Sequence, residues 1–187
     1  MCFFDVRKGK THLTRKYPYE VNEFAYDPTG EYFFVTTGQG TVEILKAATM
    51  EPHHKHFAHT SNCYCIDFDP KGRFFGVGAA DAVVSLWDAQ ELMCMRTFTN
   101  LNWAVRALSI NHDGSLIAMA SEDSFIDICN TATAERVDKV DVKYAINTVA
   151  WHPTQNLLAF AGDEKDRDDY DVGSVKVFGY RRSDLDR

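Results

Sequence analysis

The sequence predicts an all-β protein, a partial β-propeller built from four-stranded sheets called blades. Three observations predict this fold: a repeat of about 42 residues, the same turn chemistry in successive repeats, and a short apolar run after each turn. Four antiparallel strands in roughly 40–45 residues are typical of one propeller blade. At this period, the 187 residues hold about four blades and the remnant of another.

The repeat is visible in four segments that superimpose, at residues 21–30, 63–72, 105–114 and 146–155. Their last residues are separated by 42, 42 and 41 positions. Intervals so nearly equal predict a single domain of repeats over 1–187. The predicted repeat cores are about 21–57, 58–98, 104–142 and 146–179, with 1–20 as the remnant of a preceding blade.

Each repeat shows the elements of a blade in the same order. The first strand ends in a turn, and both Asp27–Gly30 and Asp69–Gly72 have Asp first, Pro second and Gly fourth, as a type I turn prefers. The short apolar runs at 32–35, 74–77, 116–119 and 157–160 predict the second strand. Segments 41–45, 83–87, 125–129 and 174–178 alternate like a third strand. More polar fourth strands are predicted at 92–98 and 136–142.

Composition and charge narrow the class of protein. With 45% hydrophobic and 25% charged residues, the chain has the composition of a folded protein and not of a disordered or membrane-bound one. A protein that binds nucleic acid on its own usually carries an excess of positive charge, whereas this chain has a net charge of −7. The charge therefore argues against strong, direct binding of nucleic acid. Five cysteines, an odd number, favour a reducing compartment, and the first residues do not form a signal peptide. These features predict the cytosol or the nucleus.

The second repeat carries a family signature. It ends in Trp87 and Asp88, opens at His59, and has Asp81 six residues before Trp87. It resembles a WD40 repeat, a family in which His, Asp and Trp join a Ser or Thr in a hydrogen-bonded structural brace inside the blade. By register Val77 stands at the hydroxyl position, so the resemblance implies an incomplete brace of His59, Asp81 and Trp87.

Further segments resemble one family of WD40 proteins. They include 59–70, 80–88, 103–109, 121–128, 149–153 and 173–179, and they resemble the C-terminal half of the THO complex subunit 3 family. The resemblance implies a nuclear scaffold subunit of the THO and TREX assembly, which packages nascent mRNA and couples transcription to export. The implied partners are other THO/TREX subunits, with RNA contacted at most indirectly, and neither a membrane nor a small-molecule substrate. The alternative is a generic WD40 adaptor, either a ubiquitin-ligase substrate receptor or a chromatin-associated scaffold.

Six metal-competent side chains lie close together in the sequence: His53, His54, His56, His59, Cys63 and Cys65. Their spacing fits none of the usual closed zinc patterns, so we predict no metal site. A metal-dependent enzyme built on this cluster is the rival hypothesis from another class, and elemental analysis distinguishes it. The chain also lacks a phosphate-binding Gly-rich loop, a Gly-x-Ser-x-Gly elbow and a His-Glu-x-x-His motif. The sequence therefore predicts no catalytic residues, no cofactor and no enzyme.

Two charged segments near the C-terminus have simple interpretations. The run 163–171 holds six carboxylates, but no glycine between Gly162 and Gly173 could form the sharp turn of a calcium loop, so it predicts a solvated loop between strands. Arg181 and Arg182 stand near two aspartates, which predicts a solvated tail.

Trp103 and Arg106 are the candidate partner-binding residues. They enter the first strand of the third repeat, where propellers expose loops at one face, and Trp and Arg are the residue types that dominate interface energies. In the alternative interpretation, Trp103 packs between blades.

The repeat register also suggests a longer ring. Phe4 stands one repeat period before Leu45 and is followed by Asp5, as Trp87 is followed by Asp88, so Met1 falls inside a repeat. The resembled family closes its rings with seven blades. We therefore expect a fragment or truncated gene product of a longer protein, whose open blade faces aggregate or pair with another chain.

Overall fold

The structure is a computed structural model that describes residues 1–163 and 174–179. These residues form β-strands and no helix, as the sequence predicts, and the all-β propeller class is confirmed. In chain order the strands are β1 (Cys2–Asp5), β2 (Lys10–Thr14), β3 (Val21–Tyr26), β4 (Tyr32–Thr37), β5 (Thr41–Lys46), β6 (Pro52–Phe57), β7 (Cys63–Phe68), β8 (Phe74–Ala79), β9 (Val84–Asp88), β10 (Cys94–Phe98), β11 (Ala107–Ile110), β12 (Leu116–Ala120), β13 (Phe125–Asn130), β14 (Arg136–Asp141), β15 (Ile146–Trp151), β16 (Leu157–Gly162) and β17 (Lys176–Gly179).

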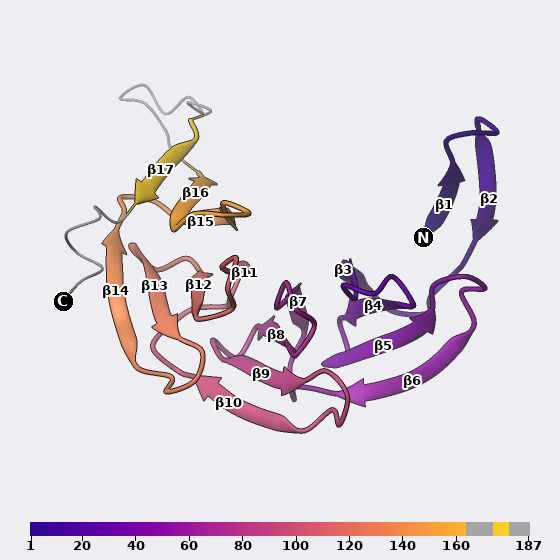
Figure 1. The fold of residues 1–187 in the computed structure, drawn as a ribbon, viewed down its shortest axis with the longest axis horizontal. Helices are drawn as coiled ribbons and strands as arrows, with labels where there is room; N and C mark the ends of the chain where they lie inside the picture. Colours follow the sequence, from indigo (N-terminus) through magenta and orange to yellow (C-terminus); the bar gives the residue numbers. More distant parts are fainter. Residues whose placement is uncertain (164–173, 180–187) are drawn as a thin grey trace.

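The strands pair in chain order into antiparallel sheets. We call β3–β6 blade 1, β7–β10 blade 2, β11–β14 blade 3 and β15–β17 blade 4, and β1 pairs with β2 in a separate hairpin. Blade 4 has three strands among the described residues, and blades 1 to 3 have four each. The blades stand side by side in an open arc, with the hairpin and blade 4 at its two ends (Figure 1).

One predicted boundary moves for a local reason. The fourth strand of blade 2 begins at Cys94, and the segment before it is a turn. The Asp88 carboxylate accepts the N–H groups of Gln90 and Glu91, and Leu92 has a left-handed φ of 54°. The apolar character of Leu92 and Met93 suggested a strand, but the Asp88 turn takes precedence over it.

The blades pack through their middle strands and contact one another along their first strands, β3, β7, β11 and β15. The second strands β4, β8 and β12 are buried almost throughout, because both of their faces are covered. Blade 2 and the hairpin β1–β2 cover β4, whereas neighbouring blades cover both faces of β8 and β12. Between blades 1 and 2, the Phe34 ring lies 4.8 Å from that of Phe68 and 5.3 Å from that of Phe75, measured between centroids. The fourth strands β6, β10 and β14 lie on the outer, convex side of the arc (Figure 1).

A ladder of hydrogen bonds links the first strands of successive blades. The backbone N–H of Ile66 donates to Glu23 Oε2 at 2.8 Å, that of Ile110 to Asp67 Oδ2 at 2.9 Å, and that of Trp151 to Ser109 Oγ at 3.2 Å. In each rung the acceptor side chain belongs to the earlier blade. Burial raises the pKa of both carboxyl groups, Glu23 and Asp67.

The hairpin β1–β2 packs against blade 1. The Phe3 ring meets the buried Phe33 edge-on, with 5.7 Å between centroids, and Arg15 Nη1 donates to the Met50 carbonyl at 2.8 Å. Within the hairpin, the backbones of Met1 and Arg15 exchange hydrogen bonds at 2.8 and 2.9 Å. In the part of the chain that the structure describes, no helix is long and apolar enough to span a membrane.

Candidate protein-interaction site

The brace of blade 2 is joined through Ser85. His59 Nε2 lies 2.7 Å from Ser85 Oγ, Trp87 Nε1 donates to the same oxygen at 2.6 Å, and His59 Nδ1 lies 3.2 Å from Asp81 Oδ2. The expectation that Val77 occupies the hydroxyl position is wrong. Val77 pairs with Ser85 on the adjacent strand, so the hydroxyl lies one strand further out than the register suggested.

Blade 3 fills the same place with different chemistry. Asp127, one repeat period after Ser85, is fully buried, and its carboxylate accepts from Arg136 Nε and, at 2.8 Å, from Asn100 Nδ2. Cys129 stands where blade 2 has Trp87, with its Sγ 3.3 Å from Asp127 Oδ2. Both arrangements tie the third strand to the loop that enters the blade, so neither leaves its polar groups free for a ligand.

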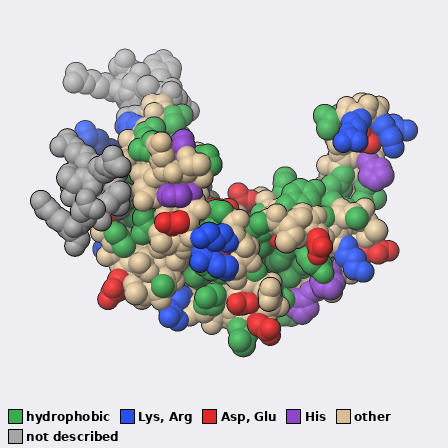
Figure 2. Space-filling view, viewed as in Figure 1, with side chains coloured by type: hydrophobic (Ala, Val, Ile, Leu, Met, Phe, Trp, Pro, Cys, Tyr) green, Lys and Arg blue, Asp and Glu red, His purple; other side chains and the backbone are tan. Residues whose placement is uncertain are grey.

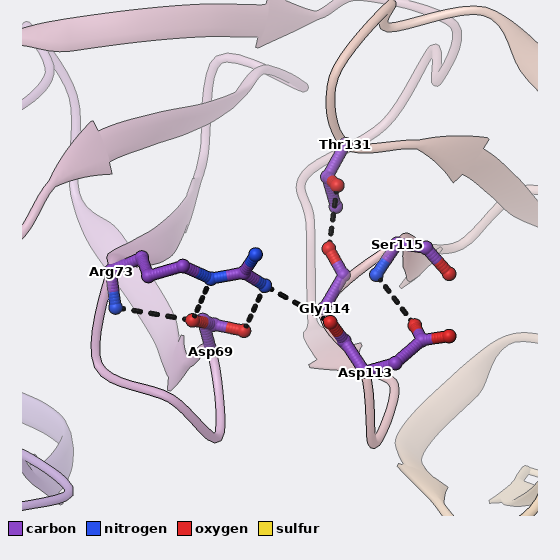
Figure 3. Close-up of polar contacts among 6 residues, drawn as sticks. All are labelled: Asp69, Arg73, Asp113, Gly114, Ser115 and Thr131. Atoms are coloured by element: carbon purple, nitrogen blue, oxygen red, sulfur yellow. Dashed lines mark hydrogen bonds and ion pairs between the residues drawn. The ribbon is translucent and has the colours of Figure 1, made fainter.

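A second polar cluster joins blades 2 and 3 at their turns (Figure 3). The Arg73 guanidinium donates to both carboxylate oxygens of buried Asp69, at 2.7 and 2.8 Å, and its Nη2 also donates to the Asp113 carbonyl at 3.0 Å. Burial alone would raise the pKa of Asp69, but the hydrogen bonds from Arg73 outweigh it and the pKa is lowered. We call Asp69, Arg73 and Asp113 the turn lock.

Gly114 makes the turn lock possible. Its φ of +79° lies in the left-handed region, and a Cβ at this position would lie 2.1 Å from Arg73 Nη2 and 2.1 Å from Asp69 Oδ1. Glycine is therefore required both by the backbone and by the approach of the ion pair.

The opposite ends of the first strands form a cavity of about 570 Å³, which we call the channel mouth. It is lined by Tyr64, Ala104, Arg106, Glu122, Asn147 and Asp163. Arg106 and Glu122 form an ion pair across it, and each side chain is 44% exposed. Asn147 donates a hydrogen bond to Asp163 on the other side. The channel mouth is thus a charged, water-accessible concavity with an aromatic wall.

The structure places the two predicted partner-binding residues in different settings, although they are close in sequence. Arg106 lines the channel mouth, whereas Trp103 stands in the loop before it and is 59% exposed. The alternative in which Trp103 packs between blades is wrong. A large aromatic side chain in water beside a concavity is the pattern of a protein-binding surface.

The other residues of the channel mouth were not predicted, although the repeat carried a signal. Tyr64, Arg106 and Asn147 stand one repeat period apart, and so do Glu122 and Asp163. Equivalent positions of successive blades meet around one axis. Extending the register from Arg106 would have found Tyr64 and Asn147, whereas Glu122 and Asp163 belong to a second register position.

The His/Cys cluster does not assemble into a metal site. His53, His54 and His56 lie on the outer strand β6, whereas Cys63 and Cys65 are buried on the inner strand β7. Among residues 1–163 and 174–179, no three His, Cys, Asp or Glu side chains are placed to hold a metal ion.

The buried thiols are unsuited to nucleophilic chemistry. Burial raises the pKa of Cys63 and of Cys129 to about 12, and it raises the pKa of Cys65 well above the ordinary value. At neutral pH these groups stay protonated, and only a thiolate is a strong nucleophile. The predictions for 163–171, beyond Asp163 itself, and for Arg181 and Arg182 lie outside the described residues.

The repeated four-stranded blades, together with the brace of His59, Asp81, Ser85 and Trp87, define a WD40-repeat propeller. Residues 50–88 match the family described as "WD domain, G-beta repeat", and residues 97–154 match "Anaphase-promoting complex subunit 4 WD40 domain". The chain belongs to the WD40-repeat proteins.

Within that class, the chain is 49% identical to THO complex subunit 3 of Arabidopsis thaliana over 184 residues, which is 98% of this chain and 58% of the relative. It is 33% identical to the WD repeat-containing protein AAC3 of Dictyostelium discoideum, over 86% of this chain and 34% of that protein. The chain thus spans little more than half the length of the first relative and a third of the second.

A solved structure supports the fold alone. The crystal structure of RRP9 WD40 repeats superimposes with a TM-score of 0.75, at 17% identity, covering 88% of this chain and 52% of that one.

Proposed function

We propose that this chain is a scaffold subunit of a THO/TREX-type assembly, acting in co-transcriptional mRNA packaging and nuclear mRNA export. The observation that carries the proposal is the 49% identity to THO complex subunit 3 along 98% of the chain. Identity at this level over nearly the whole chain includes surface positions, which the WD40 fold itself leaves free to vary. The proposal therefore extends beyond the fold to the partners that the surface contacts.

The channel mouth and Trp103 are the proposed contact site for other subunits. Trp103 offers a large apolar area that binding would remove from water, and the Arg106–Glu122 pair provides one donor and one acceptor group beside it. Because this ion pair is half exposed, it adds little to the stability of the free chain. Arg106 and Glu122 can therefore separate and bind groups of a partner with only a small loss of free energy.

The proposed role is non-catalytic, in the nucleus, and without cofactor. It is supported by the channel mouth, where Arg106 pairs with Glu122 and Asn147 with Asp163, and by the buried thiols of Cys63, Cys65 and Cys129, whose raised pKa keeps them protonated. Contacts with other THO subunits, and not with a small molecule or a membrane, are the proposed mode of action.

Affinity purification of the tagged full chain from nuclear extract, followed by mass spectrometry, tests the proposal. We expect THO subunits to be recovered with the wild-type chain and to fall at least about tenfold with W103A/R106A, since two interface residues of these types commonly contribute more than about 1 kcal/mol each. Phe57→Ala, which removes an aromatic side chain that is 74% exposed on blade 1, is the matched control and should leave recovery unchanged. Recovery of a ubiquitin-ligase adaptor or of chromatin proteins in place of THO subunits would favour the generic WD40 adaptor instead.

A further inference from the structure

The hairpin β1–β2 differs in charge from the rest of the molecule. Residues 5–16 contain five Lys or Arg and one Asp, a net charge of +4, so the remainder of the chain carries −11. Figure 2 shows Lys and Arg side chains at the hairpin end of the arc, whereas most acidic side chains visible on this face lie over the blades. The whole-chain charge of −7, which argues against nucleic-acid binding, is a sum that hides this local exception.

The turn of the hairpin presents its cations outward. The Asp5 carboxylate accepts the backbone N–H groups of Arg7 and Lys8, at 2.9 and 3.0 Å, and Gly9 continues the turn with a φ of 61°. The one carboxylate is therefore occupied by the turn backbone, with a looser contact of 3.7 Å to the Lys8 ammonium. The hairpin conformation is held from inside while its charged groups face water.

Most cations of the hairpin are open to an external anion. Arg7, Lys8, Lys10 and Lys16 are exposed, and of these only Lys8 forms an ion pair within the part of the chain that the structure describes. Arg15 differs, because it is half-buried and donates to the Met50 carbonyl at 2.8 Å, which anchors the hairpin to blade 1. Arg7, Lys8 and Lys10 thus gather at the turn of an anchored hairpin, and Lys16 follows its second strand at the other end.

The same hairpin carries an exposed aromatic side chain, one residue pair away from Lys10. Phe4 is 61% exposed and pairs across the hairpin with Thr11, next to the pairing of Asp5 with Lys10. Surfaces that bind single-stranded nucleic acid combine cations along the backbone path with aromatic rings on which bases stack. An acidic protein segment would use the cations but would have no need of the ring.

We propose that the hairpin β1–β2 binds single-stranded RNA, with phosphates on the cations of the turn and a base stacked on Phe4. This inference does not rest on membership in a THO-type assembly, because it concerns the purified chain and RNA alone. The surface is small and the remaining chain is acidic, so the binding is weak and strongly salt-dependent.

The test measures binding of a fluorescein-labelled 20-nucleotide oligouridylate to the full chain by fluorescence anisotropy, between about 50 and 200 mM salt. The variant R7Q/K8Q/K10Q should bind at least about tenfold more weakly at the lowest salt. Its slope of log affinity against log salt should be smaller by about 2, since each phosphate contact contributes about 0.7. The variant K46Q/K71Q/K143Q removes the same charge from exposed lysines elsewhere and should keep the wild-type slope. An equal loss in the two variants would overturn the proposal, as would no loss in the first.

Two further measurements separate RNA from other anions. Phe4→Ala should weaken binding about fivefold or more through loss of stacking, whereas Phe57→Ala, at a more exposed aromatic residue outside the hairpin, should not. Polyglutamate of equal charge should compete poorly with the oligouridylate. If polyglutamate competes equally well and Phe4→Ala has no effect, the hairpin is a docking surface for acidic protein segments and the RNA proposal fails.

Discussion

Blades 2 and 3 both tie their third strand to the loop that enters the blade, but they use different hydrogen-bonding groups to do so. Blade 2 places the neutral hydroxyl of Ser85 between a histidine and a tryptophan, whereas blade 3 places the buried carboxylate of Asp127 between an arginine and an asparagine. Blade 1 offers a third solution, in which the Tyr19 hydroxyl donates to Glu43. The three acceptors stand one repeat period apart, so the propeller requires a satisfied polar group at this position and not a particular motif.

The largest effect that separates the two blades is expected from the tryptophan. Trp87→Ala removes a large side chain that packs edge-on against His56, with centroids 4.2 Å apart, and should lower the free energy of unfolding by about 3–5 kcal/mol. Cys129→Ala at the equivalent position of blade 3 removes one sulfur and should cost about 1 kcal/mol. Urea denaturation measures both, and equal costs would show that the two blades depend on this position alike.

The contact that joins the two blades gives the next test. Gly114→Ala places a Cβ against the Asp69–Arg73 pair and should cost about 3 kcal/mol. Gly30→Ala is the matched control, because Gly30 has a φ of +75° but no atom within 4 Å of the place its Cβ would take, so it should cost only the left-handed strain of about 1 kcal/mol. If the two glycines cost the same, the turn lock adds nothing to stability.

The hydroxyl of the brace is expected to contribute less than the tryptophan. Ser85→Ala leaves His59 Nε2 and Trp87 Nε1 without their shared acceptor and should cost about 2 kcal/mol. Val77→Thr offers a hydroxyl at the position that the sequence register suggested. It should not restore stability in the Ser85→Ala background, and recovery there would reinstate Val77 as the brace position.

Two aspartates of blade 2 should make the free energy of unfolding depend on pH in opposite directions, with smaller changes than those expected from the substitutions above. The pKa of Asp69 is lowered, so the stability it contributes is present above its unfolded value of 3.8 and is lost as the pH falls below it. The pKa of Asp67 is raised, so the native state binds the proton more tightly and stability falls as the pH rises from 3.8 through the folded pKa. Urea midpoints between about pH 3 and 6 should show D69N removing the first dependence and D67N the second. A change of the same sign in the two variants would contradict this assignment.

The smallest effect on stability is expected at the proposed contact site. Trp103→Ala should change the free energy of unfolding by less than about 0.5 kcal/mol, because the side chain is 59% exposed. The melting temperature of this variant, compared with that of Trp87→Ala, separates an interface tryptophan from a structural one. A loss of stability as large as that of Trp87→Ala would show that Trp103 has a structural role in the core.

The sequence predicted the blades well because turn chemistry and apolar runs are local. Asp27, Asp69 and their glycines marked the turns, and the runs after them became β4 and β8. The sequence placed the brace hydroxyl at Val77 instead of Ser85, because these two residues pair on adjacent strands. The spacing along the chain does not tell which of the two side chains contacts His59. The channel mouth depends on the curvature of the whole arc, so its residues could be grouped by period but not placed at one cavity.

The ladder between the first strands has a consequence for how the protein is made. Each rung runs from a backbone N–H of the later blade to a side chain of the earlier one, as Ile66 to Glu23 and Ile110 to Asp67 show. On the ribosome the earlier blade emerges first, so each acceptor is already in place when the strand that needs it leaves the exit tunnel. Assembly can thus proceed blade by blade in the direction of translation, with every finished blade serving as the template on which the next one forms.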